Sequence, residues 1–305
     1  MKILIYGVGG IGGFIGAFLC KTEFEIDFLS RGKTFFNLKN HGLNLQSRLE
    51  NLKFKNINIF DKLEDFSNYD LIILSVKLYD FKDCLINIKN KNYNKKTIIL
   101  PFQNGIFAEQ LVRDYLSNRI NYGAVAQISS YLDNYSKIIH KGKLATFFVG
   151  PILKSNKKNK KLLNFCHKLL EVGLDIRYTE KINQKLWDKF IFLSAYSGMT
   201  TLTKMTIGQI FDNSTLKEMF VQAMNETYKL SKEYGVFFEY DPIERWQEKI
   251  SSMPYDMTSS MFLDFKNNKR LELNWLSGSV VKLSEGFKLK PVTHKKILEQ
   301  ISLIK

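Results

Sequence analysis

A glycine-rich turn near the start of the chain constrains the fold more than any other feature. Gly7-Val8-Gly9-Gly10-Ile11-Gly12 has the spacing G-x-G-x-x-G and follows the apolar run Ile3–Tyr6. In this spacing the first glycine permits a tight turn, the second leaves the backbone bare, and the third lets a helix pack closely on the preceding strand. The sequence therefore predicts a strand, a turn and then a helix, whose apolar residues recur with helical period at Ile11, Phe14, Ile15, Phe18 and Leu19.

Backbone N–H groups at such a helix start bind a pyrophosphate well. We therefore predict that all six residues, Val8 and Ile11 included, contact a dinucleotide. The alternative is a signal peptide, because Lys2 precedes an apolar stretch that ends in Phe18-Leu19-Cys20. Several glycines interrupt that stretch and no small-residue cleavage site follows it, so we assign the segment to the fold.

Composition indicates a soluble globular protein of about two domains. The chain has 305 residues, of which 45% are apolar and 13% aromatic, and no apolar run is long enough for a membrane span. Its three cysteines, Cys20, Cys84 and Cys166, are widely separated, which favours a reducing cytoplasm. The four histidines are equally scattered, so no metal site is predicted.

The net charge of +15 raises the possibility of nucleic-acid binding. However, the basic residues are 38 Lys and only 7 Arg, and they are spread along the whole chain. Arginine is the residue suited to bidentate contacts with phosphates and bases, so its scarcity argues against that function. The densest run, Lys154 to Lys161, is predicted to be a solvated loop that leads into a helix. A positive field that attracts an anionic cofactor and substrate explains the charge better.

The order of predicted elements indicates an α/β domain followed by a helical one. Short apolar runs alternate with helical patterns as far as Tyr178, which predicts a mostly parallel sheet covered by helices. Beyond that point the pattern is helical to the end. We predict a Rossmann-type dinucleotide-binding domain over residues 1–179 and an all-α domain over 180–305, with the active site in the cleft between them. The expected strands are Lys2–Tyr6, Glu25–Leu29, Leu71–Val76, Thr97–Leu100, Asn121–Ala126, Lys137–His140 and Ala145–Val149, and the expected long helices are Gln184–Ser194, Leu216–Tyr234 and Glu272–Glu285.

The end of the second predicted strand indicates which dinucleotide binds. In this fold an acid at that strand end selects NAD through the 2′-hydroxyl of the adenosine ribose. Here Asp27 falls inside the strand, whereas Arg31, with Lys33 close by, follows its end. A guanidinium suits a 2′-phosphate, so we predict NADP; the alternative is that Arg31 is an ordinary exposed cation.

Further motifs occur in a characteristic order along almost the whole chain. Together with the glycine turn and Arg31, this order resembles the ketopantoate reductase family, the NADPH-dependent 2-dehydropantoate 2-reductases. The motifs are Leu74-Ser75-Val76-Lys77, Gln103-Asn104-Gly105, Leu186-Trp187-Asp188-Lys189, Thr258–Asp264 and Arg270–Gly278.

The resemblance implies two catalytic residues. The proton-donating lysine of the family corresponds to Lys189, although the residues alone leave Lys185 open, because positions i and i+4 share a helix face. The family's carboxylate, which contacts cofactor or substrate and pairs with the lysine, corresponds to Glu272. An acid there would keep the lysine protonated against desolvation, which lowers a lysine pKa. The alternative for Glu272 is a charge at a helix N-terminus.

The resemblance also implies binding residues. Lys77 corresponds to a cofactor-binding lysine, and Asn104 to an amide that contacts both the nicotinamide ribose and the substrate. The alternative for Asn104 is an ordinary Asn-Gly turn. Ser260 corresponds to a substrate-binding serine, with a helix cap as the alternative, and Asp264 to an acid of the same cleft.

The chain departs from the family where the substrate binds. The family has asparagines four, eight and some eighteen residues after its lysine, and these positions here are Leu193, Ser197 and Ile207. Losing amides that bond a polar substrate costs orders of magnitude in discrimination. We expect reduction of ketopantoate, which would place the enzyme in pantothenate and coenzyme A biosynthesis, or of a related, more apolar 2-oxo acid. The alternative is an NADPH-binding sensor without catalysis, and a homodimer is possible in either case.

Overall fold

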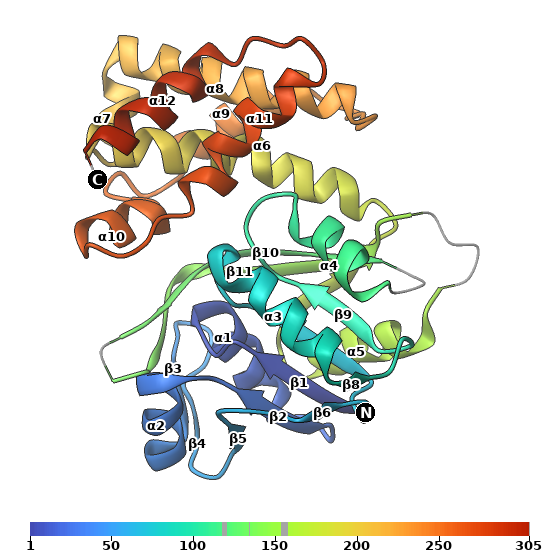
Figure 1. Cartoon of the computed structure of the whole chain (residues 1–305). Helices are drawn as coiled ribbons and strands as arrows, with labels where there is room; N and C mark the ends of the chain where they lie inside the picture. The colour runs from blue at the N-terminus through green and yellow to red at the C-terminus, as the bar shows by residue number, and fades with distance from the viewer. Residues whose placement is uncertain (118–120, 134, 154–157, 305) are drawn as a thin grey trace. The chain divides into compact units, whose positions relative to one another are not determined.

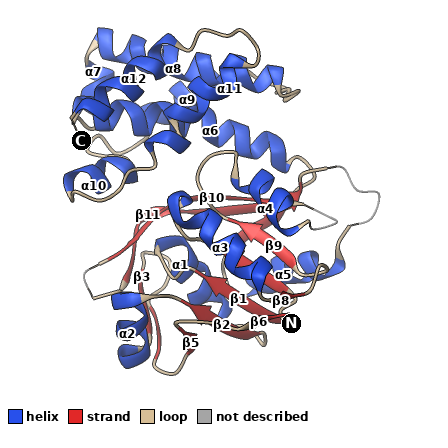
Figure 2. Cartoon of the chain, viewed as in Figure 1, coloured by secondary structure: helices blue, strands red, loops and turns tan. Residues whose placement is uncertain are grey.

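The structure, a computed structural model, describes residues 1–117, 121–133, 135–153 and 158–304 (Figure 1). It divides into two compact units. Unit 1 comprises Met1–Gln103 and Phe107–Ile182, and unit 2 comprises Asn104–Ile106 and Asn183–Lys305. Unit 1 combines parallel strands with helices and unit 2 is helical, so the predicted Rossmann-type and all-α fold classes are confirmed (Figure 2).

The main sheet of unit 1 has five strands in the order β5-β2-β1-β7-β9, all parallel. The order reverses at β1, since the chain adds β2 and β5 on one side and β7 and β9 on the other. Ligands of open α/β sheets bind at the carboxyl end of such a reversal. The strands are β1 (Lys2–Tyr6), β2 (Glu25–Leu29), β5 (Asn58–Phe60), β7 (Leu71–Leu74) and β9 (Ile98–Pro101).

A second sheet in unit 1 has the order β10-β11-β3-β4, with β12 paired to β11. The two strands expected at Lys137–His140 and Ala145–Val149 are one strand, β11. Pairing continues across both because residues 142–144 form a bulge where the register to β10 shifts next to Ser129. The strands are β3 (Leu43–Gln46), β4 (Leu52–Phe54), β10 (Tyr122–Leu132), β11 (Ile138–Pro151) and β12 (Asp175–Tyr178).

Apart from helix α1 (Gly10–Leu19), the remaining elements in the described part of unit 1 are four helices and a small parallel pair of strands, β6 (Asp65–Phe66) and β8 (Asn92–Tyr93). Helix α5 begins at Lys160, after Asn159 caps its first N–H groups. The predicted loop Lys154–Lys161 therefore ends in a helix, although residues 154–157 lie outside the described part. The helices are α2 (Gly32–His41), α3 (Leu78–Asn90), α4 (Ala108–Leu116) and α5 (Lys160–Glu171).

Helix α1 (Gly10–Leu19) is buried between the two sheets, and its glycines allow this. A Cβ on Gly16 would lie 2.5 Å from the Phe28 ring of the main sheet, and one on Gly13 would lie 2.6 Å from Ile138 of the second sheet. Both distances are far below van der Waals contact. Helix α1 therefore lies at the centre of the core between the two sheets.

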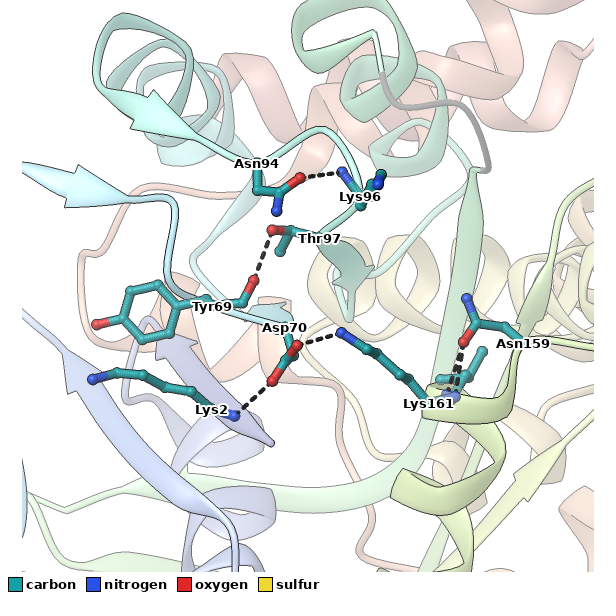
Figure 3. Close-up of polar contacts among 9 residues, drawn as sticks. Lys2, Tyr69, Asp70, Asn94, Lys96, Thr97, Asn159 and Lys161 are labelled. Carbon is teal, nitrogen blue, oxygen red and sulfur yellow. Dashed lines mark hydrogen bonds and ion pairs between the residues drawn. The ribbon is translucent and has the colours of Figure 1, made fainter.

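Polar contacts join the amino ends of the central strands, at the edge of the main sheet away from the glycine turn (Figure 3). The Lys2 backbone N–H donates to the Asp70 carboxylate over 3.0 Å, and the Lys161 ammonium donates to its other oxygen. Lys161 thereby lowers the pKa of Asp70. The Thr97 hydroxyl donates to the Tyr69 carbonyl over 2.7 Å. These contacts tie α5 to β1 and β7 and stabilise the fold at this edge.

The regular secondary structure that the structure describes in unit 2 is helical. The single helix expected over Glu272–Glu285 is instead a short 3₁₀ turn, η1, followed by α11, because the backbone of Leu276 (φ −107°, ψ −96°) is not helical. None of the described helices has the length and apolarity needed to cross a membrane. The helices are α6 (Ile182–Thr203), α7 (Ile207–Asp212), α8 (Ser214–Glu233), α9 (Pro242–Ser251), α10 (Ser260–Lys266), η1 (Leu273–Trp275), α11 (Ser277–Glu285) and α12 (Val292–Leu303).

A fully buried histidine connects three of these helices. His294 of α12 lies with Nε2 2.9 Å from the Ala223 carbonyl of α8, and with Nδ1 3.2 Å from the Ser277 hydroxyl of α11. A carbonyl only accepts, so Nε2 carries the proton and Nδ1 accepts from the serine. Burial lowers the pKa of His294 to about 4. The folded state therefore favours the neutral ring.

We expect unit 2 to lose stability as the pH falls from about 6.5 to about 4. The folded pKa of His294 lies below the ordinary value of 6.5, so its contribution is fully present above 6.5 and is lost on acidification. The loss is about 3 kcal/mol if the ring stays buried. Denaturant melts followed by tryptophan fluorescence measure it, because all three tryptophans belong to unit 2.

The matched variants are His294→Asn, which removes the titrating ring, and His167→Asn, which removes an exposed one. In His294→Asn the free energy of unfolding should be lower at pH 7 and should change less with pH. His167→Asn should keep the dependence of the wild type. Equal slopes in wild type and His294→Asn would contradict the assignment.

Candidate functional site

The glycine turn has the geometry that its spacing predicts. Gly7 has φ +99°, a conformation that side chains disfavour, and its N–H donates to the Leu29 carbonyl over 2.9 Å. The Ser75 hydroxyl donates to the Gly7 carbonyl over 2.6 Å. A Cβ on Gly12 would collide with both Ser75 and Gly7. Gly7 and Gly12 are therefore required by the fold itself, whatever binds there.

Gly9 differs from these two glycines, because the fold does not need it. Among the described residues, a Cβ on Gly9 would meet only the Ser75 carbonyl, at an ordinary 3.9 Å. Gly9 is also the N-cap of α1, and no side chain in the described part of the chain caps that helix start. The space beside Gly9 and the helix N-terminus suit a phosphate group. The residues present thus fit a bound dinucleotide.

Two polar atoms near this turn have no hydrogen-bond partner among the described residues. They are the hydroxyl of Ser130, on β10, and the side-chain oxygen of Gln103, just after β9. The backbone of Ser130 also lies against Gly10, where an added Cβ would collide with it. Buried polar atoms normally have partners, so these two are candidates for ligand contacts. Sequence analysis missed Ser130, because nothing in its neighbourhood marks it.

Asp27, inside β2, and Arg31, just after its end, have different surroundings. Asp27 is buried and accepts from the Tyr69 hydroxyl over 2.7 Å, with the Lys2 ammonium 3.4 Å away. It is therefore part of the fold, as its position inside the strand implies. Arg31, the N-cap residue of α2, is largely exposed and donates to Asp80 of α3 over 2.6 Å. Lys77 is the N-cap residue of the same helix α3.

In unit 2, the structure brings two of the predicted residues together. The Lys189 ammonium, on α6, donates to the side-chain oxygen of Asn104 over 2.8 Å. Asn104 belongs to unit 2, because the short segment Asn104–Ile106 groups with the helical residues and not with the residues of unit 1 on either side of it. Gly105 follows with φ +99°, so an Asn-Gly turn is present as well. The amide and the ammonium form the polar centre of the candidate site in this unit.

Helix α6 is anchored beside Lys189 by a contact that sequence analysis missed. The Trp246 indole N–H of α9 donates to the Asp188 carbonyl over 2.9 Å and approaches its carboxylate at 3.2 Å. Burial raises the pKa of Asp188, and the nearby Arg245 guanidinium opposes this shift. The contact holds the helical turn that carries Lys189.

Glu272, Ser260 and Asp264 also belong to unit 2. Glu272 is buried and directly precedes η1, so it does not start a long helix as expected. Ser260 is exposed at the first position of α10, and the residue that caps this helix is Ser259, whose hydroxyl also contacts Thr200 over 2.7 Å. Asp264 is half-buried in α10.

The three positions that depart from the family lie in or against the core of unit 2. Leu193 is half-buried on α6, one helical turn beyond Lys189. Ser197 is buried a further turn along. Ile207 is buried as well, and its backbone N–H donates to the Met257 carbonyl over 2.9 Å. The first position thus offers an apolar side chain near the lysine, and the third belongs to the core.

The described residues include no group of three or more His, Cys, Asp or Glu side chains placed to hold a metal ion. Burial raises the pKa of Cys166 to about 12 and of Cys20 to about 11, which disfavours their thiolates.

Comparison with known proteins identifies relatives over both units. The family model described as ketopantoate reductase PanE/ApbA matches residues 3–153, and its C-terminal counterpart matches residues 181–305. A Bacillus subtilis protein named uncharacterized oxidoreductase YkpB is 26% identical, over 95% of this chain and 94% of its own length. A 2-dehydropantoate 2-reductase of Pyrococcus horikoshii is also 26% identical, over 93% and 91%.

Solved structures share the fold. D-mandelate dehydrogenase in a ternary complex with NADH and anilino(oxo)acetate has a TM-score of 0.87 at 19% identity, covering 99% of this chain and 98% of that one. A ketopantoate reductase of Staphylococcus aureus, described as dimeric, has a TM-score of 0.77 at 15% identity, covering 99% and 98%.

Gly9, which the packing does not require, and Gly12, which it does, allow a direct test of whether the turn binds a phosphate. Gly9→Ala should leave the stability of unit 1 nearly unchanged, within about 1 kcal/mol for a changed helix cap, but should weaken NADPH binding. Gly12→Ala should destabilise unit 1 by roughly 1–3 kcal/mol, because its Cβ has no room. Circular dichroism melts and calorimetric titration with NADPH measure the two effects. Unchanged NADPH affinity in Gly9→Ala would argue against a phosphate at this turn.

Proposed function

This chain belongs to the ketopantoate reductase family and is an NADP-dependent oxidoreductase of 2-oxo acids, and we propose that it reduces ketopantoate or a related branched 2-oxo acid. The product is the corresponding 2-hydroxy acid. The observation that carries the proposal is the contact between Lys189 and Asn104, a cationic acid held by an amide. The proposal includes a role in pantothenate and coenzyme A biosynthesis if the substrate is ketopantoate.

Lys189 has the central chemical role in this proposal. When bound, NADPH supplies the hydride that adds to the carbonyl carbon of the oxo acid. The carbonyl oxygen gains negative charge as this happens, and the Lys189 ammonium stabilises that charge and donates the proton. The Asn104 oxygen, 2.8 Å away, accepts from the ammonium and orients it. Glu272, a buried carboxylate, favours the protonated lysine.

The cofactor is assigned to residues of unit 1 and to Asn104. The backbone of Gly7–Gly12 binds the pyrophosphate, and Arg31 and Lys77 bind the adenosine end. Asn104 and Glu272 contact the nicotinamide end in the same proposal. The open space at Gly9 supports this assignment, as does the buried Ser130 hydroxyl, for which the described residues offer no hydrogen-bond partner.

The substrate side of the proposal rests on α6 and α10. Ser260 and Asp264 are proposed to contact the substrate, together with Asn104 and Lys189. Leu193 replaces an amide of the family pattern with an apolar group one turn from Lys189. We therefore propose that the site accepts an oxo acid with a branched or more apolar side chain. The anilino(oxo)acetate named with D-mandelate dehydrogenase likewise carries a bulky, largely apolar group beside its oxo group.

A cytoplasmic homodimer completes the proposal. The cytoplasm agrees with the three cysteines, none of which forms a disulfide. The dimeric relative from Staphylococcus aureus supports self-association. Sedimentation equilibrium of the purified protein distinguishes a monomer of 35.5 kDa from a dimer.

We expect Lys189→Ala to lose roughly 10²–10⁴-fold in kcat for the best 2-oxo acid of a panel, because the proton donor is removed. NADPH affinity should be retained. The rate of NADPH oxidation, with and without each oxo acid, is the measurement. Lys185→Ala is the matched control, four residues away on the same helix, and should retain activity. Tight NADPH binding with no turnover of any oxo acid would instead favour the sensor function.

We expect the side chain at position 193 to set the preference for a substrate hydroxyl. The test compares ketopantoate with trimethylpyruvate, in which a methyl group replaces the hydroxymethyl group. The wild type should discriminate between them by less than roughly 100-fold in kcat/KM, since an apolar pocket neither rewards nor strongly rejects a hydroxyl. Leu193→Asn should shift the ratio toward ketopantoate.

Leu193→Ala serves as the control for lost packing, since it removes apolar volume and adds no amide. A ratio that moves equally in Leu193→Ala and Leu193→Asn would contradict a role for the amide. Melting curves of both variants confirm that each is folded at the assay temperature.

A further inference from the structure

The cation assigned to the adenosine end of the cofactor is paired with an acid. The Arg31 guanidinium donates to the Asp80 carboxylate over 2.6 Å. Arg31 follows β2, and Asp80 lies in the first turn of α3, which follows β7. Both strands flank β1 in the parallel sheet, so their carboxyl ends meet at one edge. The topology thereby brings the acid to the cation, although they are 49 residues apart.

The two partners favour different cofactors. A guanidinium beside the adenosine ribose favours the 2′-phosphate of NADP, whereas a carboxylate there favours the free 2′-hydroxyl of NAD, from which it accepts a hydrogen bond. In most proteins of this fold that acid comes from the end of β2 itself. Here Asp27 of β2 is buried and occupied by Tyr69 and Lys2. Asp80 supplies the acid from a neighbouring element.

We propose that Asp80 is a specificity-determining residue for the cofactor, which weakens binding of the 2′-phosphate and supports binding of the 2′-hydroxyl. It does so by competing for the Arg31 guanidinium and by repelling the phosphate dianion. This inference rests on the proposed function, since it takes Arg31 as the residue at the adenosine end.

Exposure indicates how large the effect is. The side chain of Arg31 is 79% exposed and that of Asp80 is 31% exposed. An ion pair so open to solvent is weak, so a phosphate can displace Asp80 from Arg31. The chain therefore keeps NADP as a cofactor, with Asp80 reducing the preference by a modest factor.

The test measures dissociation constants of NADP⁺ and NAD⁺ by calorimetry for the wild type and for Asp80→Asn, without any oxo acid present. The repulsion between the Asp80 carboxylate and a 2′-phosphate a few ångströms away is screened by water, so we expect NADP⁺ to bind about five-fold more tightly to Asp80→Asn. NAD⁺ should bind equally well or more weakly. A ratio of the two constants that is the same in both proteins overturns the proposal.

Two controls separate this role from a structural one. Asp83→Asn removes an exposed acid that lies just under one helical turn after Asp80 on α3. This variant should leave the ratio of the two dissociation constants unchanged. If Asp83→Asn changes the ratio as much as Asp80→Asn does, general charge is responsible and the proposal fails. Melting temperatures of both variants detect any loss of stability from removing an acid at the start of α3.

The double variant Arg31→Ala/Asp80→Asn identifies the mechanism. If Asp80 competes for Arg31, the gain in NADP⁺ affinity on replacing Asp80 should largely vanish when Arg31 is absent. A gain of the same size in both backgrounds overturns the competition part of the proposal. Failure of the wild type to bind either dinucleotide would refute the proposed function instead, so the two failures are distinguishable.

Discussion

The close approach of helix α1 to two sheets is the constraint on which unit 1 depends. Larger side chains at the contacts would push the helix farther from each sheet than it lies here. Gly12, Gly13 and Gly16 have no Cβ at these three contacts, so the close approach is possible. The second sheet can then pack on the other side of α1, and Phe14, Phe18 and Phe147 fill the space around the glycines. Close packing at this density tolerates no added methyl group.

The same approach creates the binding turn. Because α1 starts directly over the carboxyl end of β1, its first N–H groups open toward the edge where β2 and β7 also end. The Ser75 hydroxyl, at the end of β7, holds the Gly7 carbonyl and so fixes the turn from the neighbouring strand. Within one turn, Gly7 and Gly12 are thus needed by the fold, whereas a side chain at Gly9 would meet only an ordinary van der Waals contact among the described residues. The glycines of the turn look alike in the sequence, but their surroundings in the structure show which of them the packing requires.

The sequence predicted those elements whose bounds depend on neighbouring residues alone. The strands Lys2–Tyr6 and Glu25–Leu29 have the expected bounds, because short apolar runs between turn residues leave few alternatives. The joining of two short segments into β11 depends on pairing with β10 across a bulge, which no local pattern encodes. The break at Leu276 is likewise hidden, since the apolar period continues through it. At the candidate site, Lys189 and Asn104 were predicted as separate residues, but their contact could only follow from the fold.

Leu193 and Ile207 stand where the family pattern has asparagines, and they differ in how far they belong to the core of unit 2. Ile207 is buried at the start of α7 and its N–H holds the Met257 carbonyl, so that position now contributes to the core of unit 2. Leu193, one turn from Lys189, remains half-buried and offers apolar surface. Under the proposed function, the Lys189 ammonium and the Asn104 amide act on the carbonyl, whereas an apolar Leu193 offers no hydrogen bond to a distant substrate hydroxyl. Because reduction of the carbonyl needs only the ammonium and the amide, that proposal expects the apolar replacement to weaken discrimination between substrates more than the reaction itself.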